Sequence, residues 1–135
     1  ASDRRRLGEG GSPDLGASMT VIHHRWDDIT PEQINSTVSR QYITAERVTM
    51  ARFELKRGAV VPQHAHENEQ VSYIISGALK FIFEGRDIIA RGGEVLQIPP
   101  NVPHAAEAIE DTLAIDVFSP VRQDWIDKTD SYFRR

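Results

Sequence analysis

The chain has 135 residues, 39% of them hydrophobic and 27% charged, so we expect one domain with a modest core rather than a disordered chain. A formal net charge of -4 argues against nonspecific nucleic-acid binding, which depends on neutralising phosphates with Lys and Arg. The chain has no cysteine, which excludes disulfides and thiolate metal sites, and no apolar stretch approaches the roughly 20 residues of a membrane span.

The first 18 residues differ in composition from the rest of the chain. They hold an Arg4-Arg5-Arg6 triplet among several glycines and lack the apolar core of a signal peptide. We interpret residues 1–18 as an appended leader or a flexible tail, and we expect the ordered domain to comprise residues 19–135. Three positive charges in a Gly-rich tail are usually solvated, so the triplet does not indicate a nucleic-acid site.

A short helix is predicted ahead of the strand-rich part of the chain. Thr30-Pro31-Glu32-Gln33 has a capping residue, a proline at the first helical position and a glutamine three residues after the cap. A second short helix is predicted after the strands, because Ser119-Pro120 repeats the cap and the proline before Val121–Ile126. Arg122 and Ile126 would share one face of it, and we expect Trp125 to pack on the rim of the domain.

From Arg47 onward, the sequence pattern is that of an all-β protein. Strands are predicted at Val48–Leu55, Val71–Ile75, Leu79–Phe83, Arg86–Ala90, Glu94–Ile98, His104–Ala108 and Leu113–Phe118. The last two flank Glu110-Asp111 and are predicted to form a hairpin. Short strands at regular spacing, separated by Gly and Pro, are typical of a sandwich or barrel.

Three histidines and a glutamine have the spacing of a metal site. Residues i and i+2 of a strand point to the same face, so His64 and His66 can direct two imidazoles to one point, and Gln70 can join them if the strand continues. His104 follows the Pro99-Pro100-Asn101 turn and begins a later strand. These donors suit one divalent transition metal such as Zn, Ni, Fe or Mn. Alternatively, the Gln70 amide orients a water, since it is a weaker donor than a carboxylate.

Candidate catalytic residues lie near the end of the last strand. Asp116 lies within an apolar stretch, so it is either a structural hydrogen-bonding residue or a general acid/base beside the metal. Arg122 is either a surface salt-bridge residue or an anchor for a substrate carboxylate, and Phe118 is either a core residue or a sugar-contacting aromatic. Arg52, among apolar strand residues, is a candidate second anchor facing the interior.

The two histidine clusters resemble the two motifs of the cupin superfamily. They read Gly58-x5-His64-x-His66-x3-Gln70-x6-Gly77 and Gly93-x5-Pro99-x4-His104. The resemblance implies a single small jelly-roll barrel with the metal inside and short flanking helices. Two positions depart from the pattern: Gln70 stands where a Glu is usual, and Asn101 stands where a Gly is usual. Asparagine also tolerates the left-handed conformation.

More narrowly, the chain resembles the KdgF-type pectin-degradation cupins, which act on unsaturated uronates. That group has a three-His-one-Gln site and an Asp-x-Phe-x3-Arg run, matched here by Asp116, Phe118 and Arg122. The resemblance implies metal-dependent conversion of a 4,5-unsaturated monouronate, released from pectin or alginate, to the linear 4-deoxy-5-keto-uronate. The metal would act as a Lewis acid, Asp116 would move protons, Arg122 would hold the carboxylate and Phe118 would contact the sugar.

Two other functions fit the same residues. An iron-dependent dioxygenase would use the open metal positions for O2, and full activity on a redox-inactive metal without oxygen would separate it from the uronate enzyme. A sugar-binding or sensing cupin would bind uronate without turnover, and Asp116 would then be dispensable. We expect a small anionic sugar as the ligand, no nucleic-acid or membrane partner and a cytoplasmic location. Apolar strand edges and an N-terminal arm also predict a homodimer, for which strand exchange is one route.

Overall fold

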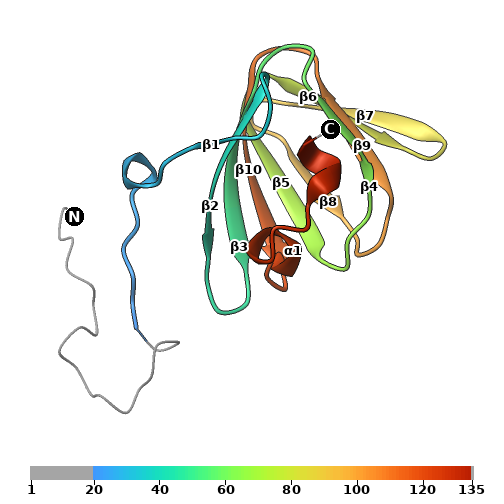
Figure 1. Ribbon diagram of the computed structural model, residues 1–135. Helices are drawn as coiled ribbons and strands as arrows, with labels where there is room; N and C mark the ends of the chain where they lie inside the picture. Colours follow the sequence, from blue (N-terminus) through green and yellow to red (C-terminus); the bar gives the residue numbers. More distant parts are fainter. Residues whose placement is uncertain (1–19, 135) are drawn as a thin grey trace. The chain divides into compact units, whose positions relative to one another are not determined.

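The computed structural model describes residues 20–134 and shows the predicted all-β jelly-roll fold (Figure 1). The chain divides into two units, Ala1–Thr30 and Pro31–Arg135, and the second contains the barrel. In the first unit, Trp26–Asp28 form the 3₁₀ helix η3. The prediction of a leader or flexible tail at residues 1–18 lies outside the described residues. Within the described part, no helix has the length and apolar character needed to cross a membrane.

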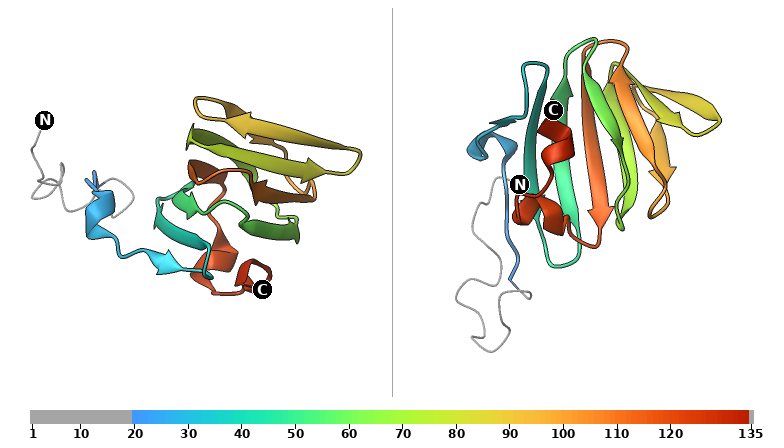
Figure 2. Two further views of the ribbon diagram at one scale, coloured as in Figure 1. Left: turned by 90° about the horizontal axis from the view of Figure 1, so that it is seen from above. Right: turned by 45° about the vertical axis from the view of Figure 1, so that its right-hand side comes forward.

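Two antiparallel sheets face each other to form the barrel (Figures 1 and 2). The six-stranded sheet has the order β1-β2-β3-β10-β5-β8, with strands at Glu32–Gln33, Val38–Thr44, Thr49–Leu55, Thr112–Ser119, Glu69–Ser76 and Val95–Ile98. The four-stranded sheet has the order β4-β9-β6-β7, with strands at Val60–His64, His104–Ala108, Ala78–Phe83 and Arg86–Arg91.

The register of the six-stranded sheet decides which side chains face the barrel interior. Residues directly opposite each other in an antiparallel pair share a face. Asp116 of β10 lies opposite Ser72 of β5, and Phe118 lies opposite Gln70. Ala51, opposite Asp116 on β3, is completely buried, so this face is the inner one. The pairing of β10 with β3 and β5 therefore directs Asp116, Phe118 and Gln70 into the barrel.

The predicted hairpin of β9 and β10 is wrong. β9 pairs with β4 and β6, whereas β10 pairs with β3 and β5 in the other sheet. Residues 109–111 thus carry the chain from one sheet to the other, next to Gly77, where β5 passes into β6. The Thr112 hydroxyl lies 3.2 Å from the Ala78 nitrogen and 3.1 Å from its carbonyl oxygen, so it joins the two crossing segments. The Glu110-Asp111 pair is a corner of the barrel and not a hairpin turn.

The helix predicted at Thr30-Pro31-Glu32-Gln33 is also wrong. Glu32–Gln33 form β1, in which Glu32 lies opposite Arg40 of β2. The Arg40 guanidinium donates to the Glu32 carboxylate at 2.7 Å. Sheet pairing and this ion pair outweigh the local preference of the capping pattern, which contributes only about 1 kcal/mol.

The C-terminal helix begins later than its sequence pattern indicates. Helix α1 comprises Gln123–Ile126, and its N-cap residue is Arg122 instead of Ser119. Arg122 is buried whereas Ile126 is 45% exposed, so the two do not share a face. A second short element, the 3₁₀ helix η4 at Ser131–Arg134, was not predicted. The η4 segment contacts β4 of the four-stranded sheet, and its Phe133 stacks on Phe53 of β3 in the other sheet.

Side chains from both sheets and from the C-terminal segment fill the interior. The buried hydrophobic residues are Ile34, Val38, Ala51, Phe53, Leu55, Ala59, Ile74, Leu79, Phe81, Ala90, Ile98, Ala106, Ala108, Ala114, Phe118, Trp125 and Phe133. Trp125 lies deeper than the predicted rim position, because its ring packs edge-on against Phe53 and Phe118. The hydrophobic core thus includes side chains of the C-terminal segment that follows β10.

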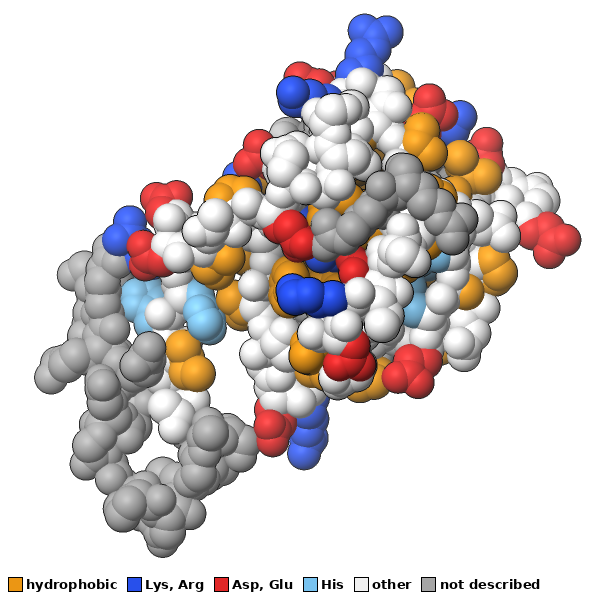
Figure 3. Space-filling model, viewed as in Figure 1, with side chains coloured by type: hydrophobic (Ala, Val, Ile, Leu, Met, Phe, Trp, Pro, Cys, Tyr) orange, Lys and Arg blue, Asp and Glu red, His pale blue; other side chains and the backbone are white. Residues whose placement is uncertain are grey.

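The outer face of the six-stranded sheet carries an apolar row that crosses the strands. Ile115 lies opposite Tyr73, and Tyr73 lies opposite Val95, which is 59% exposed. Arg52 flanks this row on β3 and pairs with Glu54 at 2.8 Å outside the barrel. The prediction that Arg52 faces the interior is therefore wrong. On the face drawn in Figure 3, charged side chains of both signs are interspersed with hydrophobic ones.

This apolar row is our proposed contact in the homodimer that the sequence predicts, since exposed apolar patches mark association surfaces. Tyr73→Glu places a charge in the middle of the row, and we expect it to convert the dimer to a monomer in sedimentation velocity. Ile89→Glu is the matched control, because Ile89 is 43% exposed on β7 of the other sheet. A wild-type monomer, or a dimer that survives Tyr73→Glu, would contradict this contact.

Two glycine variants test the barrel corner. Gly77 and Gly85 both have positive φ angles, but a Cβ at Gly77 would overlap the backbone oxygen of Asp111, whereas a Cβ at Gly85 has no atom within 4 Å. We expect Gly85→Ala to cost about 1–2 kcal/mol of unfolding free energy from backbone strain alone. Gly77→Ala should cost roughly 3 kcal/mol or more, because overpacking adds to the strain. If urea denaturation shows the same loss of unfolding free energy for Gly77→Ala and Gly85→Ala, the close approach of Gly77 to Asp111 does not limit stability.

Candidate metal centre

The three histidines reach one point from different elements of the barrel. His64 is the last residue of β4 and lies directly opposite His104, the first residue of β9. His66 lies in the loop after β4, and Gln70 reaches the cluster from β5 in the other sheet. The strand of His64 therefore does not continue to Gln70, and the condition under which the spacing would place Gln70 beside the histidines is not met. The three imidazoles nevertheless offer donor atoms that all lie within 4.8 Å of one another.

Backbone carbonyls fix the orientation of all three rings. The Nδ1 atoms of His64, His66 and His104 lie 2.9, 3.0 and 2.8 Å from the carbonyl oxygens of Pro62, Asn68 and Val102. A carbonyl can only accept, so in each neutral ring Nδ1 carries the proton and Nε2 carries the lone pair. Each Nε2 is thus prepared to bind a metal. The buried His104 Nε2 has no hydrogen-bond partner among the described residues.

The Gln70 side chain is oriented as a metal ligand would be. Its Nε2 lies 3.0 Å from Ser72 Oγ and 3.5 Å from Asp116 Oδ2, so its Oε1 faces the histidines. Oε1 lies 3.1 Å from His66 Nε2. These are two acceptors in contact, an arrangement that a shared cation stabilises. Ligands each about 2.1 Å from one metal are separated by roughly this distance. The donor set of three imidazoles and one amide oxygen therefore fits a divalent transition metal.

Burial keeps the histidines neutral. Desolvation, followed by repulsion from His104, lowers the pKa of His64 to about 3. Desolvation, followed by repulsion from the Arg122 guanidinium, lowers the pKa of His66 to about 4. The pKa of His104 is lowered as well, mainly by burial. At neutral pH no proton has to leave these rings before a metal can bind.

The loop that carries His66 is tied to both neighbouring segments. Asn68 is buried and donates from Nδ2 to the carbonyls of Pro120 and Val121, the latter at 3.0 Å. Asn101 has a φ angle of 65°, and its backbone N–H donates to the His66 carbonyl at 2.7 Å. The left-handed conformation expected for Asn101 is therefore present. It holds the second histidine motif against the first.

Asp116 lies on the inner face, next to the proposed metal ligands. Its carboxylate contacts the Gln70 amide and lines the same cavity as His64 and His104. Burial raises the pKa of Asp116 to about 6, although the Ser72 hydroxyl and the Arg122 charge oppose this effect. A carboxyl group with such a pKa can both take up and release a proton near neutral pH. The pattern that suggested a functional Asp116, a carboxylate within an apolar strand, thus marked a residue of the cavity wall.

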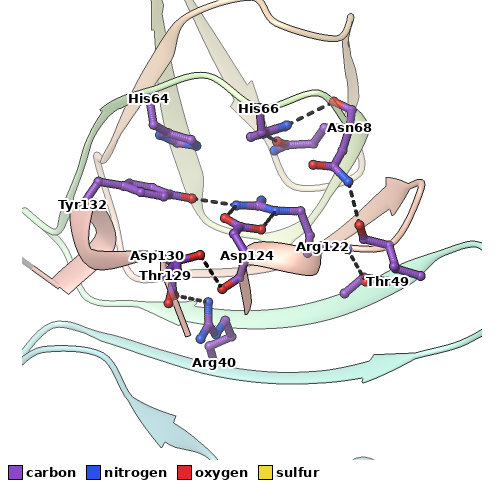
Figure 4. A network of polar contacts seen from close by, with 12 residues as sticks. Arg40, Thr49, His64, His66, Asn68, Arg122, Asp124, Thr129, Asp130 and Tyr132 are labelled. Atoms are coloured by element: carbon purple, nitrogen blue, oxygen red, sulfur yellow. Dashed lines mark hydrogen bonds and ion pairs between the residues drawn. The ribbon is translucent and has the colours of Figure 1, made fainter. Parts of the chain in front are cut away.

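Arg122 is buried and already has partners. Its Nε and Nη2 donate to both carboxylate oxygens of Asp124 at 2.9 and 2.7 Å, and Nη2 also donates to Tyr132 Oη at 2.8 Å (Figure 4). The guanidinium lies over the rings of Phe118 and Trp125, 4.7 and 4.4 Å from their centroids. The positive charge is therefore held rigidly at the wall of the cavity.

Phe118 belongs both to the core and to the site. It is 2% exposed, and its ring meets the His66 ring edge-on at 5.6 Å between centroids. Together with its contact to the Arg122 guanidinium, this places Phe118 between a metal-ligand candidate and the cation. The two interpretations of Phe118 from the sequence are thus compatible.

A cavity of about 50 Å³ lies inside the barrel beside these residues. Its polar lining comprises His64, Gln70, His104, Asp116, Arg122 and Tyr132. Of the residues around the site, the sequence patterns did not find Asn68, Ser72, Asp124 and Tyr132. Ser72 had a signal, since it lies two residues beyond Gln70 on the same strand face. Tyr132 had none, because the C-terminal segment reaches the site only through tertiary packing.

Comparison with known proteins agrees with this architecture. The family model for the cupin domain matches residues 51–118. The structure of KdgF from Halomonas sp. is 29% identical, with a TM-score of 0.68, and the match covers 73% of this chain and 94% of that chain. An RmlC-like cupin from Shewanella frigidimarina NCIMB 400 is 27% identical, with a TM-score of 0.70 and coverage of 76% and 93%.

More distant matches show the fold alone. The polyketide cyclase RemF from Streptomyces resistomycificus is 22% identical, with a TM-score of 0.64 and coverage of 73% and 78%. No curated protein matches the chain. The segment matched by the family model spans half of the chain and contains every proposed metal ligand. The chain therefore belongs to the cupin family.

Proposed function

We propose that this cupin is a metal-dependent enzyme that converts 4,5-unsaturated monouronates to linear 4-deoxy-5-keto-uronates. His64, His66, Gln70 and His104 would hold one divalent transition metal: Zn, Ni, Fe or Mn. The likeness to KdgF and the Asp-x-Phe-x3-Arg run support this proposal. The observation that carries it is the position of Asp116, a carboxyl group with a raised pKa in contact with the Gln70 amide.

The reaction is an isomerisation that needs a group to move protons. A proton leaves the hemiacetal hydroxyl as the ring carbon–oxygen bond breaks, and a proton is added at C4 as the resulting enol becomes the ketone. Asp116 would accept the first proton and deliver the second, which its pKa of about 6 permits in both directions. A bound metal supplies Lewis acidity toward the substrate oxygens. The neutral Gln70 leaves its full dipositive charge available to an anionic substrate.

Arg122 and Phe118 would bind and orient the substrate. The substrate carboxylate needs a cation, and the guanidinium of Arg122, which lines the cavity, would supply it. Asp124 holds this guanidinium in place through two hydrogen bonds. Phe118 presents an apolar surface between Arg122 and His66, suited to one face of a sugar ring.

Replacing the proposed proton carrier tests the reaction. Asp116→Asn keeps the size of the side chain, so we expect an intact fold and metal content with a loss of kcat on the order of 10²-fold or more. The assay follows unsaturated galacturonate under anaerobic conditions, so that turnover also excludes the alternative of an oxygen-dependent enzyme. Asp87→Asn on the exposed surface of β7 is the control. Full activity of Asp116→Asn would refute the assigned role, and binding of uronate without turnover would favour a sensing protein.

Elemental analysis of purified variants tests the metal ligands. We expect His64→Ala and His104→Ala to lose most of the bound metal, because ligand loss should weaken metal affinity by more than the roughly 10- to 100-fold typical of supporting residues. Gln70→Glu should retain metal, since a carboxylate is a common donor. His24→Ala is the control, as His24 lies outside the barrel unit. Stoichiometric metal at full affinity in His64→Ala would show that the site is wrongly assigned.

A further inference from the structure

Tyr132 fills the space between a proposed metal ligand and the cation of the cavity wall. Its ring stacks on the His64 ring at 4.4 Å between centroids, with an angle of 19° between the planes. Its hydroxyl accepts a hydrogen bond from Arg122 Nη2 at 2.8 Å. Figure 4 shows the phenol beside His64 with its hydroxyl directed at the guanidinium. One side chain thus reaches from the histidine cluster to Arg122.

Contacts on both sides of Tyr132 hold the C-terminal segment in place. Asp130 is 1% exposed and forms an ion pair with the buried Arg40 at 3.1 Å. Phe133 is buried and stacks on Phe53 of β3 at 5.6 Å between centroids. Neither contact involves the Tyr132 ring. The Tyr132 ring also stacks on Phe133 at 5.9 Å between centroids, so a change of its rotamer gives up this contact while the Asp130 and Phe53 contacts hold the segment.

The remaining space is too small for a sugar ring. A volume of about 50 Å³ accommodates a few waters, at roughly 10–15 Å³ each. A ring-sized carboxylate that touches both the metal donors and Arg122 must occupy the place of the phenol ring. The Arg122 hydrogen bonds to Asp124 and Tyr132 use Nε and Nη2, so the overlap with such a ligand is one of space. Tyr132 therefore competes with such a ligand for the space between His64 and Arg122.

We infer that Tyr132 is a gate that determines which ligands reach the metal centre. Its side chain turns out of the cavity when a ring-sized carboxylate binds between His64 and Arg122. It stays in place when a ligand of two or three atoms binds to the metal alone. Access depends on Tyr132 whichever reaction follows, because the gate acts on binding and not on proton transfer.

Ligand titration of the Co²⁺-loaded protein tests this gate without turnover. Pyridine-2-carboxylate, a ring carboxylate with affinity for divalent metals, is titrated against the visible Co²⁺ spectrum, and azide is the small-ligand control. We expect Tyr132→Ala to bind pyridine-2-carboxylate about tenfold more tightly than the wild type, corresponding to ~1.4 kcal/mol. Azide affinity should stay the same. Tyr132→Phe retains the ring and should gain much less than Tyr132→Ala.

Ile89→Ala is the control, because Ile89 is 43% exposed on β7 and lies outside both the cavity lining and the proposed dimer contact. If Tyr132→Ala has a much lower melting temperature than the wild type, Tyr132→Leu takes its place, because leucine keeps apolar bulk. Tyr132→Leu should also bind pyridine-2-carboxylate more tightly than the wild type, by a smaller factor than Tyr132→Ala. An unchanged or weaker affinity of these variants for pyridine-2-carboxylate would overturn the gate. An equal gain for azide, or a gain in Tyr132→Phe as large as in Tyr132→Ala, would also overturn it. The uronate assay can fail while this dependence on Tyr132 persists, so the two proposals are tested separately.

Discussion

Each histidine of the metal centre is held by a hydrogen bond from Nδ1 to a backbone carbonyl two residues away in the chain. The chemistry of the site depends on these three bonds. They select the tautomer that leaves every Nε2 unprotonated, and they fix the directions in which the lone pairs point. Because each bond is local, a short stretch of chain orients its own ring. The barrel has only to bring the stretches together, which the pairing of His64 with His104 does for two of them.

The site also contains a buried positive charge, the Arg122 guanidinium, whose burial must not destabilise the fold. Burial is the main cause of the lowered pKa of His64 and His66, and the charge of Arg122 lowers it further, so both help to keep these rings neutral before metal binds. An unpaired guanidinium in the interior would be costly, and Asp124, Tyr132 and the faces of two aromatic rings offset that cost. The same segment places Asp130 on Arg40, a second buried ion pair. The chain after β10 thus stabilises the cation and closes the barrel at once.

Local patterns in the sequence predicted β3, the strands β5 to β10 and the turn at Asn101, because strand alternation and turn chemistry act over a few residues, but they did not predict β2 or β4. Local patterns gave wrong predictions where pairing between segments far apart in the chain determines the secondary structure. The Glu110-Asp111 stretch resembles a hairpin turn, yet β9 and β10 belong to different sheets because each finds partners far away in the chain. Glu32 follows a helix-capping pattern but pairs with Arg40. For Asp116 the sequence left two interpretations open, and its inward direction is set by pairing with β3 and β5.

The two sheets contribute different chemistry to the centre. The four-stranded sheet provides His64 and His104, whereas the six-stranded sheet provides Gln70, Asp116 and Phe118, and the C-terminal segment adds Tyr132. The proposed metal ligands thus come from both sheets, and the proposed proton carrier Asp116 lies beside the ligand that the six-stranded sheet provides. The Gln70 amide links the two, since its oxygen faces His66 and its nitrogen faces Asp116. A carboxylate at this position would put a second negative charge beside Asp116 and raise the pKa of that residue further. The neutral amide allows a metal ligand and a titratable carboxyl group to share one wall of the cavity.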